Sequence, residues 1–178
     1  MTISLAIDTS TSRTSVGIVD DGSLLWSGYQ DGATAHGPAL PALAQEAIAG
    51  HRIDEVVVGM GPGPFTGLRI GIAFARSFAL ARGITVRGVC SLDAIAAQVN
   101  ERDFIVTVDA RRKEVYWARY IEGLRIGEPA VNFSSDVKGT AIHSGLFPDL
   151  VALVQLTNEI SEPIYLRHPD AVATADRS

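Results

Sequence analysis

The stretch that decides the fold runs from residue 59 to residue 71 and reads Gly59-Met60-Gly61-Pro62-Gly63-Pro64-Phe65-Thr66-Gly67-Leu68-Arg69-Ile70-Gly71. It follows a short apolar run, Val56-Val57-Val58, that is typical of a buried strand, and it leads into an apolar stretch with helical spacing. Glycine permits close backbone approach and proline fixes φ, so the junction predicts a rigid turn with little side-chain bulk. Such a turn before a helix either binds an anion or lets another chain pack closely.

Two phosphate-binding motifs are excluded at this turn. A P-loop ends in Gly-Lys-Ser/Thr so that the lysine reaches the phosphates, whereas Gly67 is followed by Leu68 and Arg69. The glycines at 59, 61, 63 and 67 also lack the dinucleotide-binding spacing, and no βαβ unit surrounds them. Phosphate binding is therefore the weaker of the two interpretations.

The helix predicted over 66–81, with Thr66 as its N-cap, is apolar almost all round. One stripe holds Leu68, Ile72, Ala75 and Ala79, and other stripes hold Ile70, Phe74, Phe78 and Ala81. Such a helix is buried on more than one face. It is either a central core helix or a helix with one face on its own domain and the other on a partner helix, because an uncovered second face would be an unusually large apolar patch.

The remaining pattern predicts an α/β protein whose two halves begin alike, with strand, aspartate, turn and strand. The first half has strands at 2–8, 14–19 and 24–29, a helix at 38–49, a strand at 55–59 and, after the helix at 66–81, a helix at 92–99 that Ser91 caps. The second half has strands at 104–109 and 114–121, a third beginning at 124–126, a short strand at 140–143 and a helix at 148–160. Residues 171–178 lack apolar periodicity and are expected to fray.

Composition narrows the class of protein. The chain has 178 residues, 47% of them hydrophobic, and a net charge of −5, so no global positive field favours nucleic acid. The single cysteine, Cys90, excludes an internal disulfide framework. The chain starts without a basic leader, and its longest apolar stretch is too short for a bilayer, so we expect a cytoplasmic protein without a membrane segment.

Two groups of polar residues are candidate sites, and the histidines are not. The turn that begins with Asp8, Thr9 and Ser10, together with Asp109 in the second half, is either a residual Mg-nucleotide site or a pair of ordinary polar turns. The basic cluster Arg111-Arg112-Lys113 is either solvated charge or a contact for RNA or an acidic partner. The four histidines are scattered without metal-ligand spacing, so no metal site and no catalytic residue is assigned.

Four segments resemble the TsaB (YeaZ) family of tRNA threonylcarbamoyladenosine biosynthesis subunits. They are Leu5-Ala6-Ile7-Asp8-Thr9-Ser10, Gly61 to Gly71, Asp109-Ala110-Arg111-Arg112-Lys113-Glu114-Val115-Tyr116-Trp117-Ala118, and Glu162-Pro163-Ile164-Tyr165-Leu166-Arg167. The resemblance spans nearly the whole chain, with proline at position 64 where the family pattern has serine.

The resemblance implies an actin-like (ribonuclease H-like) α/β fold of two lobes, with mixed sheets opened by β-meanders. The N-terminal lobe would cover residues 1–100 and carry the dimerisation helices, and a reduced C-terminal lobe would cover 101–170. In TsaD, the catalytic relative, a His-x-x-x-His pair binds a metal; the matching stretch here is Ser91-Leu92-Asp93-Ala94-Ile95, which lacks both histidines.

The function implied is that of a non-catalytic scaffold that dimerises with a TsaD-type subunit and activates it. A TsaE-type ATPase would join the complex, ATP and a metal would belong to partner subunits, tRNA would bind through the complex, and the isolated chain would form a homodimer. The residues expected at the interface are Leu40, Leu43, Gly61, Gly63, Phe65, Thr66, Gly67, Leu68, Ile70, Ile72, Phe74 and Phe78. The alternative is a small kinase-like phosphotransferase using Mg-ATP; the missing motifs disfavour a metalloprotease.

Overall fold

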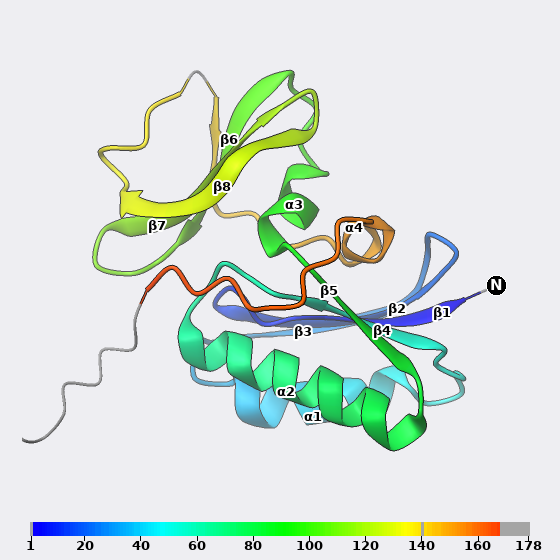
Figure 1. Ribbon diagram of the computed structural model, residues 1–178. Helices are drawn as coiled ribbons and strands as arrows, with labels where there is room; N and C mark the ends of the chain where they lie inside the picture. The colour runs from blue at the N-terminus through cyan, green and yellow to red at the C-terminus, as the bar shows by residue number, and fades with distance from the viewer. Residues whose placement is uncertain (1, 140, 168–178) are drawn as a thin grey trace, which may run out of the picture.

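The computed structural model describes residues 2–139 and 141–167, which form two mixed β-sheets with helices between and below them (Figure 1). The first sheet has the order β3-β2-β1-β4-β5. Its strands are β1 (Ile3–Asp8), β2 (Arg13–Asp20), β3 (Ser23–Asp31), β4 (Glu55–Gly59) and β5 (Thr85–Val89). The first three strands form an antiparallel meander, and β4 and β5 add in parallel beside β1.

Helices cover both faces of the first sheet. On one face lie α1 (His36–Ala47) and α2 (Phe65–Arg82), and on the other lie α3 (Ser91–Ala96) and α4 (Leu150–Gln155) (Figure 1). The main core lies between the sheet and the α1–α2 layer, where apolar side chains of alternate strand positions meet the buried stripes of both helices. Members of this core include Leu5, Ile7, Val56, Val58, Leu40, Leu68 and Ile72.

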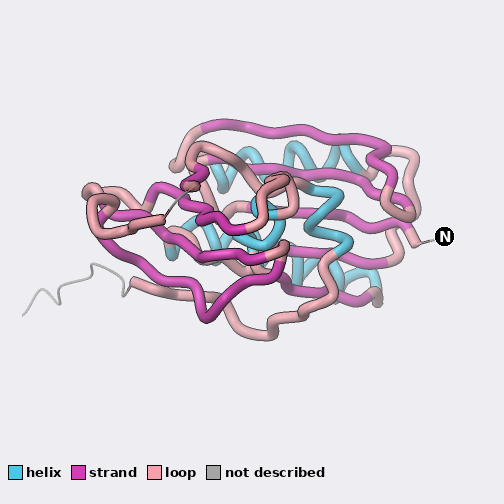
Figure 2. The backbone as a smooth tube through the Cα atoms, turned by 90° about the horizontal axis from the view of Figure 1, so that it is seen from above, coloured by secondary structure: helices cyan, strands magenta, loops and turns pink. Residues whose placement is uncertain are grey.

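The second sheet repeats the opening of the first with less cover. Its order is β8-β7-β6-β9, from β6 (Asp103–Asp109), β7 (Glu114–Ile121), β8 (Leu124–Phe133) and β9 (Ile142–His143). Seen from above, the long strands of the first sheet run side by side and the second sheet lies over one part of them (Figure 2). Helix α3 joins the two, because its Leu92 and Ile95 pack against Phe104 and Tyr120 of the second sheet.

The chain then returns to the first sheet. Helix α4 packs on β1, β2 and β4, and Leu150 and Leu153 fill the space above Ala6 and Val57. Beyond α4, the extended segment of residues 156–167 runs along the first sheet, where the Ile160 amide donates to the Gly88 carbonyl at 2.8 Å. Helix α4 therefore lies against the first sheet, and the segment after it contacts both sheets, since Ile160 bonds to β5 and Ile164 packs on the core of the second sheet.

Most sequence-based elements match the structure within a few residues, with four differences. The strand β5 was not predicted. The helix predicted over 148–160 ends at Gln155. The Arg87 guanidinium donates a hydrogen bond to the Val154 carbonyl at 2.7 Å, and the residues after the helix are extended and bond to β5. Pro64, not Thr66, is the N-cap of α2, and Cys90, not Ser91, is the N-cap of α3. The predicted tail, residues 171–178, lies outside the described residues.

Candidate functional site

Residues 59–71, here called the glycine-rich stretch, pack directly on the turn between β1 and β2. A methyl group at any of four glycines would lie within 2.6 Å of an atom of that turn. The contacts are Gly59 with the Asp8 Oδ2, Gly63 with the Ser10 carbonyl oxygen, Gly67 with the Thr9 carbonyl oxygen, and Gly71 with the Thr9 Oγ1. The glycines thus allow two segments of this chain to approach closely.

The β1–β2 turn is here called the covered turn, because the glycine-rich stretch packs over it. Its first residue, Asp8, is 1% exposed. Its Oδ1 accepts from the Ser10 amide at 2.9 Å and the Ser10 hydroxyl at 2.7 Å, and its Oδ2 accepts from the Ser91 hydroxyl at 2.6 Å. Burial raises the pKa of the Asp8 carboxyl, and these hydrogen bonds oppose the rise only in part. Asp8 therefore ties the β1–β2 turn to α3 and does not face solvent.

The structure does not gather the four predicted nucleotide residues around one cavity. Asp8, Thr9 and Ser10 are all buried, and only Asp109 lines the cavity of about 200 Å³ between the two sheets. That cavity is otherwise lined mainly by Thr11, Ser12, Arg111 and the segment of residues 144–147. Of the β1–β2 turn, Thr11 and Ser12 therefore reach this cavity, whereas Asp8, Thr9 and Ser10 lie beneath the glycines of residues 59–71.

The predicted interface residues divide into an inner and an outer group. Leu40, Leu68 and Ile72 lie inside the core, and Gly61, Gly63 and Gly67 are buried in the glycine-rich stretch. Leu43, Phe65, Ile70, Phe74 and Phe78 are half-buried, and Thr66 is exposed. Only this second group can contact another molecule without a change in the packing of the chain.

The solvent side of α1 and α2, here called the helix face, is short of negative charge. Its exposed positions are Gly37, Pro38, Pro41, Ala42, Gln45 and Glu46 of α1, and Thr66, Arg69, Ala73, Arg76, Ser77, Leu80, Ala81 and Arg82 of α2. Glu46 is the only acidic residue of the two helices. Leu80 is 84% exposed, and the rings of Phe74 and Phe78 stack with centroids 6.0 Å apart. Small and apolar side chains therefore cover much of this face.

A wide groove opens where α2 begins. Its volume is about 570 Å³, and its lining includes Phe65, Ile70, Arg111, Tyr116 and Arg167. The last of these pairs with Glu114 at the start of β7. Nearby, the ring of Tyr165 packs on Phe65 with centroids 4.9 Å apart, so the C-terminal segment forms one wall. The sequence offered one signal for this wall, the closing motif Glu162 to Arg167, which was not assigned a role.

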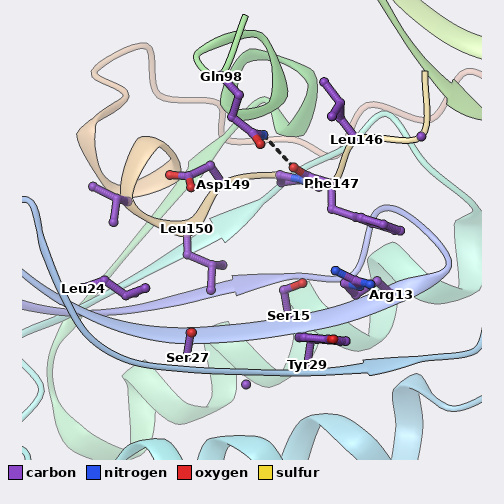
Figure 3. Close-up of a pocket in the computed structure, with 14 residues that line it drawn as sticks. Arg13, Ser15, Leu24, Ser27, Tyr29, Gln98, Leu146, Phe147, Asp149 and Leu150 are labelled. Carbon is purple, nitrogen blue, oxygen red and sulfur yellow. Dashed lines mark hydrogen bonds between the residues drawn. The ribbon is translucent and has the colours of Figure 1, made fainter. Parts of the chain in front are cut away.

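A second, open cavity of about 350 Å³ lies over β2 and β3, under the segment of residues 145–151 (Figure 3). The Arg13 guanidinium lies between the rings of Tyr29 and Phe147, 3.9 and 3.8 Å from their centroids. Asp31 accepts from it at 2.7 Å, which raises the pKa of Arg13 and lowers that of Asp31. These contacts fasten the returning chain to the sheet, and no sequence pattern indicated them.

Two features are absent from residues 2–139 and 141–167, a cluster of metal ligands and a membrane-spanning helix. No group of three or more histidine, cysteine, aspartate or glutamate side chains there is placed to hold a metal ion. No helix within the same ranges has the length and apolar character needed to cross a bilayer.

Comparison with known sequences gives consistent matches. The family model described as "TsaD: tRNA N6-adenosine threonylcarbamoyltransferase" matches residues 35–142. An uncharacterised protein of Mycobacterium tuberculosis is 43% identical over 196 residues, covering 94% of this chain and 92% of the relative. The "tRNA threonylcarbamoyladenosine biosynthesis protein TsaB" of Escherichia coli is 32% identical over 125 residues, covering 65% of this chain and 54% of that protein. The chain thus aligns with about half the length of that TsaB protein.

Solved structures agree with these matches. The structure described as "YeaZ from Pseudomonas aeruginosa" superposes with a TM-score of 0.77 at 26% identity, covering 93% of this chain and all of that one. The ethanolamine utilization protein EutJ of Carboxydothermus hydrogenoformans superposes with a TM-score of 0.52 at 13% identity over 74% of this chain and 52% of that one, which concerns the fold alone. The predicted actin-like α/β fold with two mixed sheets is confirmed.

Proposed function

Because the chain belongs to the TsaB (YeaZ) family, whose members are related to TsaD, we propose that it is a non-catalytic scaffold subunit in the threonylcarbamoyl modification of tRNA. It pairs with a TsaD-type transferase and stabilises the active form of that subunit. A TsaE-type ATPase joins the complex in the cytoplasm, and the partner subunits supply ATP and metal. In the absence of the transferase, the same surface forms a homodimer.

The helix face is the observation that carries this proposal. A monomer rarely leaves small and apolar residues exposed side by side on two adjacent helices. Ala73 of α2 and Ala42 of α1 carry little bulk, so another helix pair can approach the backbone closely. Phe74 and Phe78 supply larger apolar surface between them. The proposed contact is therefore helix against helix, with Ile70, Phe74 and Phe78 as its apolar centre.

The buried residues of the predicted interface have a different role in this proposal. Leu40, Leu68 and Ile72 hold the two helices against the first sheet and fix the shape of the helix face. The glycine-rich stretch fixes where α2 starts, because it packs on the β1–β2 turn. These residues support the interface from inside and make no direct contact with the partner.

Ala73→Glu tests the interface without disturbing the core, because Ala73 is exposed on α2. The added charge and length oppose close packing of helices, so we expect association to weaken at least about 100-fold, or roughly 3 kcal/mol. Light scattering measures the homodimer, and co-purification measures the complex with the TsaD-type subunit. Phe74→Glu is expected to have the same effect with some loss of stability.

The matched control is Leu124→Glu, which places the same charge at a 71% exposed leucine of the second sheet. It should leave association unchanged. Normal co-purification of both Ala73→Glu and Phe74→Glu would show that the partner binds elsewhere. Activity is then measured by reconstituting tRNA modification with and without this chain beside the catalytic subunit.

The alternative function, a small Mg-ATP-dependent phosphotransferase, needs nucleotide affinity in this chain alone. The burial of Asp8 and the filled space beside it count against that function. Calorimetry with Mg-ATP separates the two proposals. A dissociation constant below about 100 μM, equivalent to about 5.5 kcal/mol, would favour the phosphotransferase.

A further inference from the structure

The turn between β6 and β7 gathers positive charge in an otherwise acidic chain. Arg111, Arg112 and Lys113 follow one another at its tip, and all three are exposed. We propose that this turn binds the phosphate backbone of RNA. This inference rests on the proposed function, because the RNA is the tRNA that the complex modifies. The inference adds a tRNA-contacting surface on this subunit.

The clustering of cations supports the proposal. Arg167 of the C-terminal segment pairs with Glu114, the residue that follows the turn, and so brings a fourth cation beside the three residues of the turn. The Asp109 Oδ1 accepts the Arg111 amide at 2.9 Å at the start of the turn. These cations gather in one place, whereas the whole chain carries −5. A local positive field of this kind attracts a polyanion even when the net charge does not.

The backbone of the turn holds the three side chains in an unusual arrangement. Arg111, Arg112 and Lys113 have φ angles of 63°, 53° and 65°, in the left-handed region that residues with a Cβ rarely adopt. The turn is closed on both sides, because the Glu114 amide donates to the Arg111 carbonyl at 3.0 Å and the Ser134 amide donates to the Lys113 carbonyl at 2.9 Å. Strained conformations of this kind concentrate at functional sites, where the surrounding structure holds them in place.

The position of the turn favours RNA over an acidic protein as its ligand. Arg111 lines both the cavity between the sheets and the wide groove of about 570 Å³, so the turn lies beside two open hollows of the surface. Guanidinium groups form paired hydrogen bonds with phosphate oxygens, which suits the phosphates of an extended polyanion. The turn belongs to the second sheet, whereas the helix face lies on the far side of the first sheet (Figure 1), so RNA and the partner subunit need not compete.

The test replaces the three cations by glutamine, as Arg111→Gln, Arg112→Gln and Lys113→Gln together. Glutamine keeps a polar, unbranched side chain and removes the charge. The matched control removes two arginines and one lysine from other exposed positions, as Arg52→Gln, Arg102→Gln and Lys138→Gln. Both variants and the wild type are titrated with an unmodified tRNA transcript at a series of salt concentrations, as the isolated chain and in complex with the TsaD-type subunit.

We expect the turn variant to bind the transcript at least about 10-fold more weakly at low salt. The slope of log K against log salt should flatten by about 1 for each residue that contacts a phosphate. The control should keep the wild-type slope. Equal slopes for the turn variant and the wild type would overturn the inference, and so would the absence of RNA binding by the wild type in both preparations.

The failure of this inference is distinguishable from failure of the proposed function. If the turn variant loses the TsaD-type subunit and keeps its RNA slope, the turn binds an acidic protein surface and the inference is wrong. If the wild type fails to pair with that subunit, the proposed function is wrong, and titration of the isolated chain with the transcript then decides the role of the turn.

Discussion

The two turns that follow β1 and β6 share a local design and differ in their surroundings. Each begins with an aspartate at the end of a strand, Asp8 or Asp109. Each aspartate accepts the amide of the residue two positions later at 2.9 Å. Yet the first turn is buried, and the second places three cations in solvent. The same local hydrogen bond therefore occurs in a buried turn of the first sheet and in an exposed, positively charged turn of the second sheet.

The difference comes from what the chain places over each turn. In the first sheet, α2 starts beside β1, and its glycines seat the helix on the turn. In the second sheet, the chain after β9 continues to α4, which packs on the first sheet. Within the described residues, no helix covers the β6–β7 turn in the way that α2 covers its counterpart. The β6–β7 turn is therefore exposed, whereas the β1–β2 turn is buried.

The largest effect expected from this comparison is at the covered turn. Gly63→Ala would put a methyl group 2.3 Å from the Ser10 carbonyl oxygen, a backbone atom that cannot move without shifting the turn. We expect the free energy of unfolding to fall by about 3 kcal/mol or more. Urea denaturation of the isolated chain measures it.

Gly37→Ala is the matched control, because nothing lies within 4 Å of the added methyl group and the residue is exposed in α1. It should leave stability unchanged or raise it by up to about 1 kcal/mol. If Gly63→Ala unfolds within about 1 kcal/mol of the wild type, the glycine-rich stretch does not pack on the turn as described.

The next largest effect is a difference in the stability lost when the side chain of Asp8 or of Asp109 is removed. Asp8→Ala removes the acceptor of three hydrogen bonds in the interior and leaves the Ser10 amide and the Ser91 hydroxyl without this partner, so we expect a loss of about 2 kcal/mol. Asp109→Ala removes one exposed hydrogen bond and should cost less than about 1 kcal/mol. Chemical denaturation of both variants gives the comparison, and equal losses would contradict the assignment of one turn to the interior.

A smaller effect is the pH dependence of the covered turn. Burial raises the pKa of Asp8 above its ordinary value of 3.8, so the folded state holds this proton at a pH where the unfolded chain has lost it. The contribution of Asp8 to stability is therefore greatest below pH 3.8 and declines as the pH rises through the folded pKa. Each tenfold difference in proton affinity is worth about 1.4 kcal/mol.

Asp8→Asn tests this, because asparagine keeps the shape and does not titrate. Denaturation of both proteins from about pH 4 to about pH 8 should show that the wild type loses stability relative to the variant as the pH rises. Parallel profiles would mean that the Asp8 carboxyl keeps its ordinary affinity for protons in the folded state. Asp109→Asn serves as the control on the exposed turn.

The sequence predicted the elements of the fold better than their contacts. Strands and helices follow from local periodicity, so β4, β7 and α2 were placed almost to the residue. Strand β5 was missed because Arg87 and Gly88 interrupt its apolar run; in the structure Arg87 donates to the Val154 and Leu156 carbonyls at the end of α4. That role depends on a segment 67 residues away, which no local pattern reveals.

The site shows the same limit. The glycine-rich stretch was predicted to be a rigid corner, but its spacing does not say which segment packs against it; in the structure that segment includes Thr9 and Ser10 of the same chain. Likewise, helical periodicity found Leu68 and Phe74 without showing which one faces the sheet. The sandwich of Arg13 between Tyr29 and Phe147 joins residues with no common motif, so only the folded structure reveals it.

The smallest effect expected concerns the exposed turn. Lys113 has a φ of 65°, where glycine is as stable as in any other region and a residue with a Cβ is strained. Lys113→Gly relieves that strain at the cost of a more flexible unfolded chain, so we expect a net gain of about 0.5 kcal/mol. Lys138→Gly, at an exposed lysine outside the left-handed region, should lose about as much. Opposite signs in thermal denaturation would establish that the exposed turn is held in a strained form, which its covered counterpart avoids by packing; equal losses would contradict it.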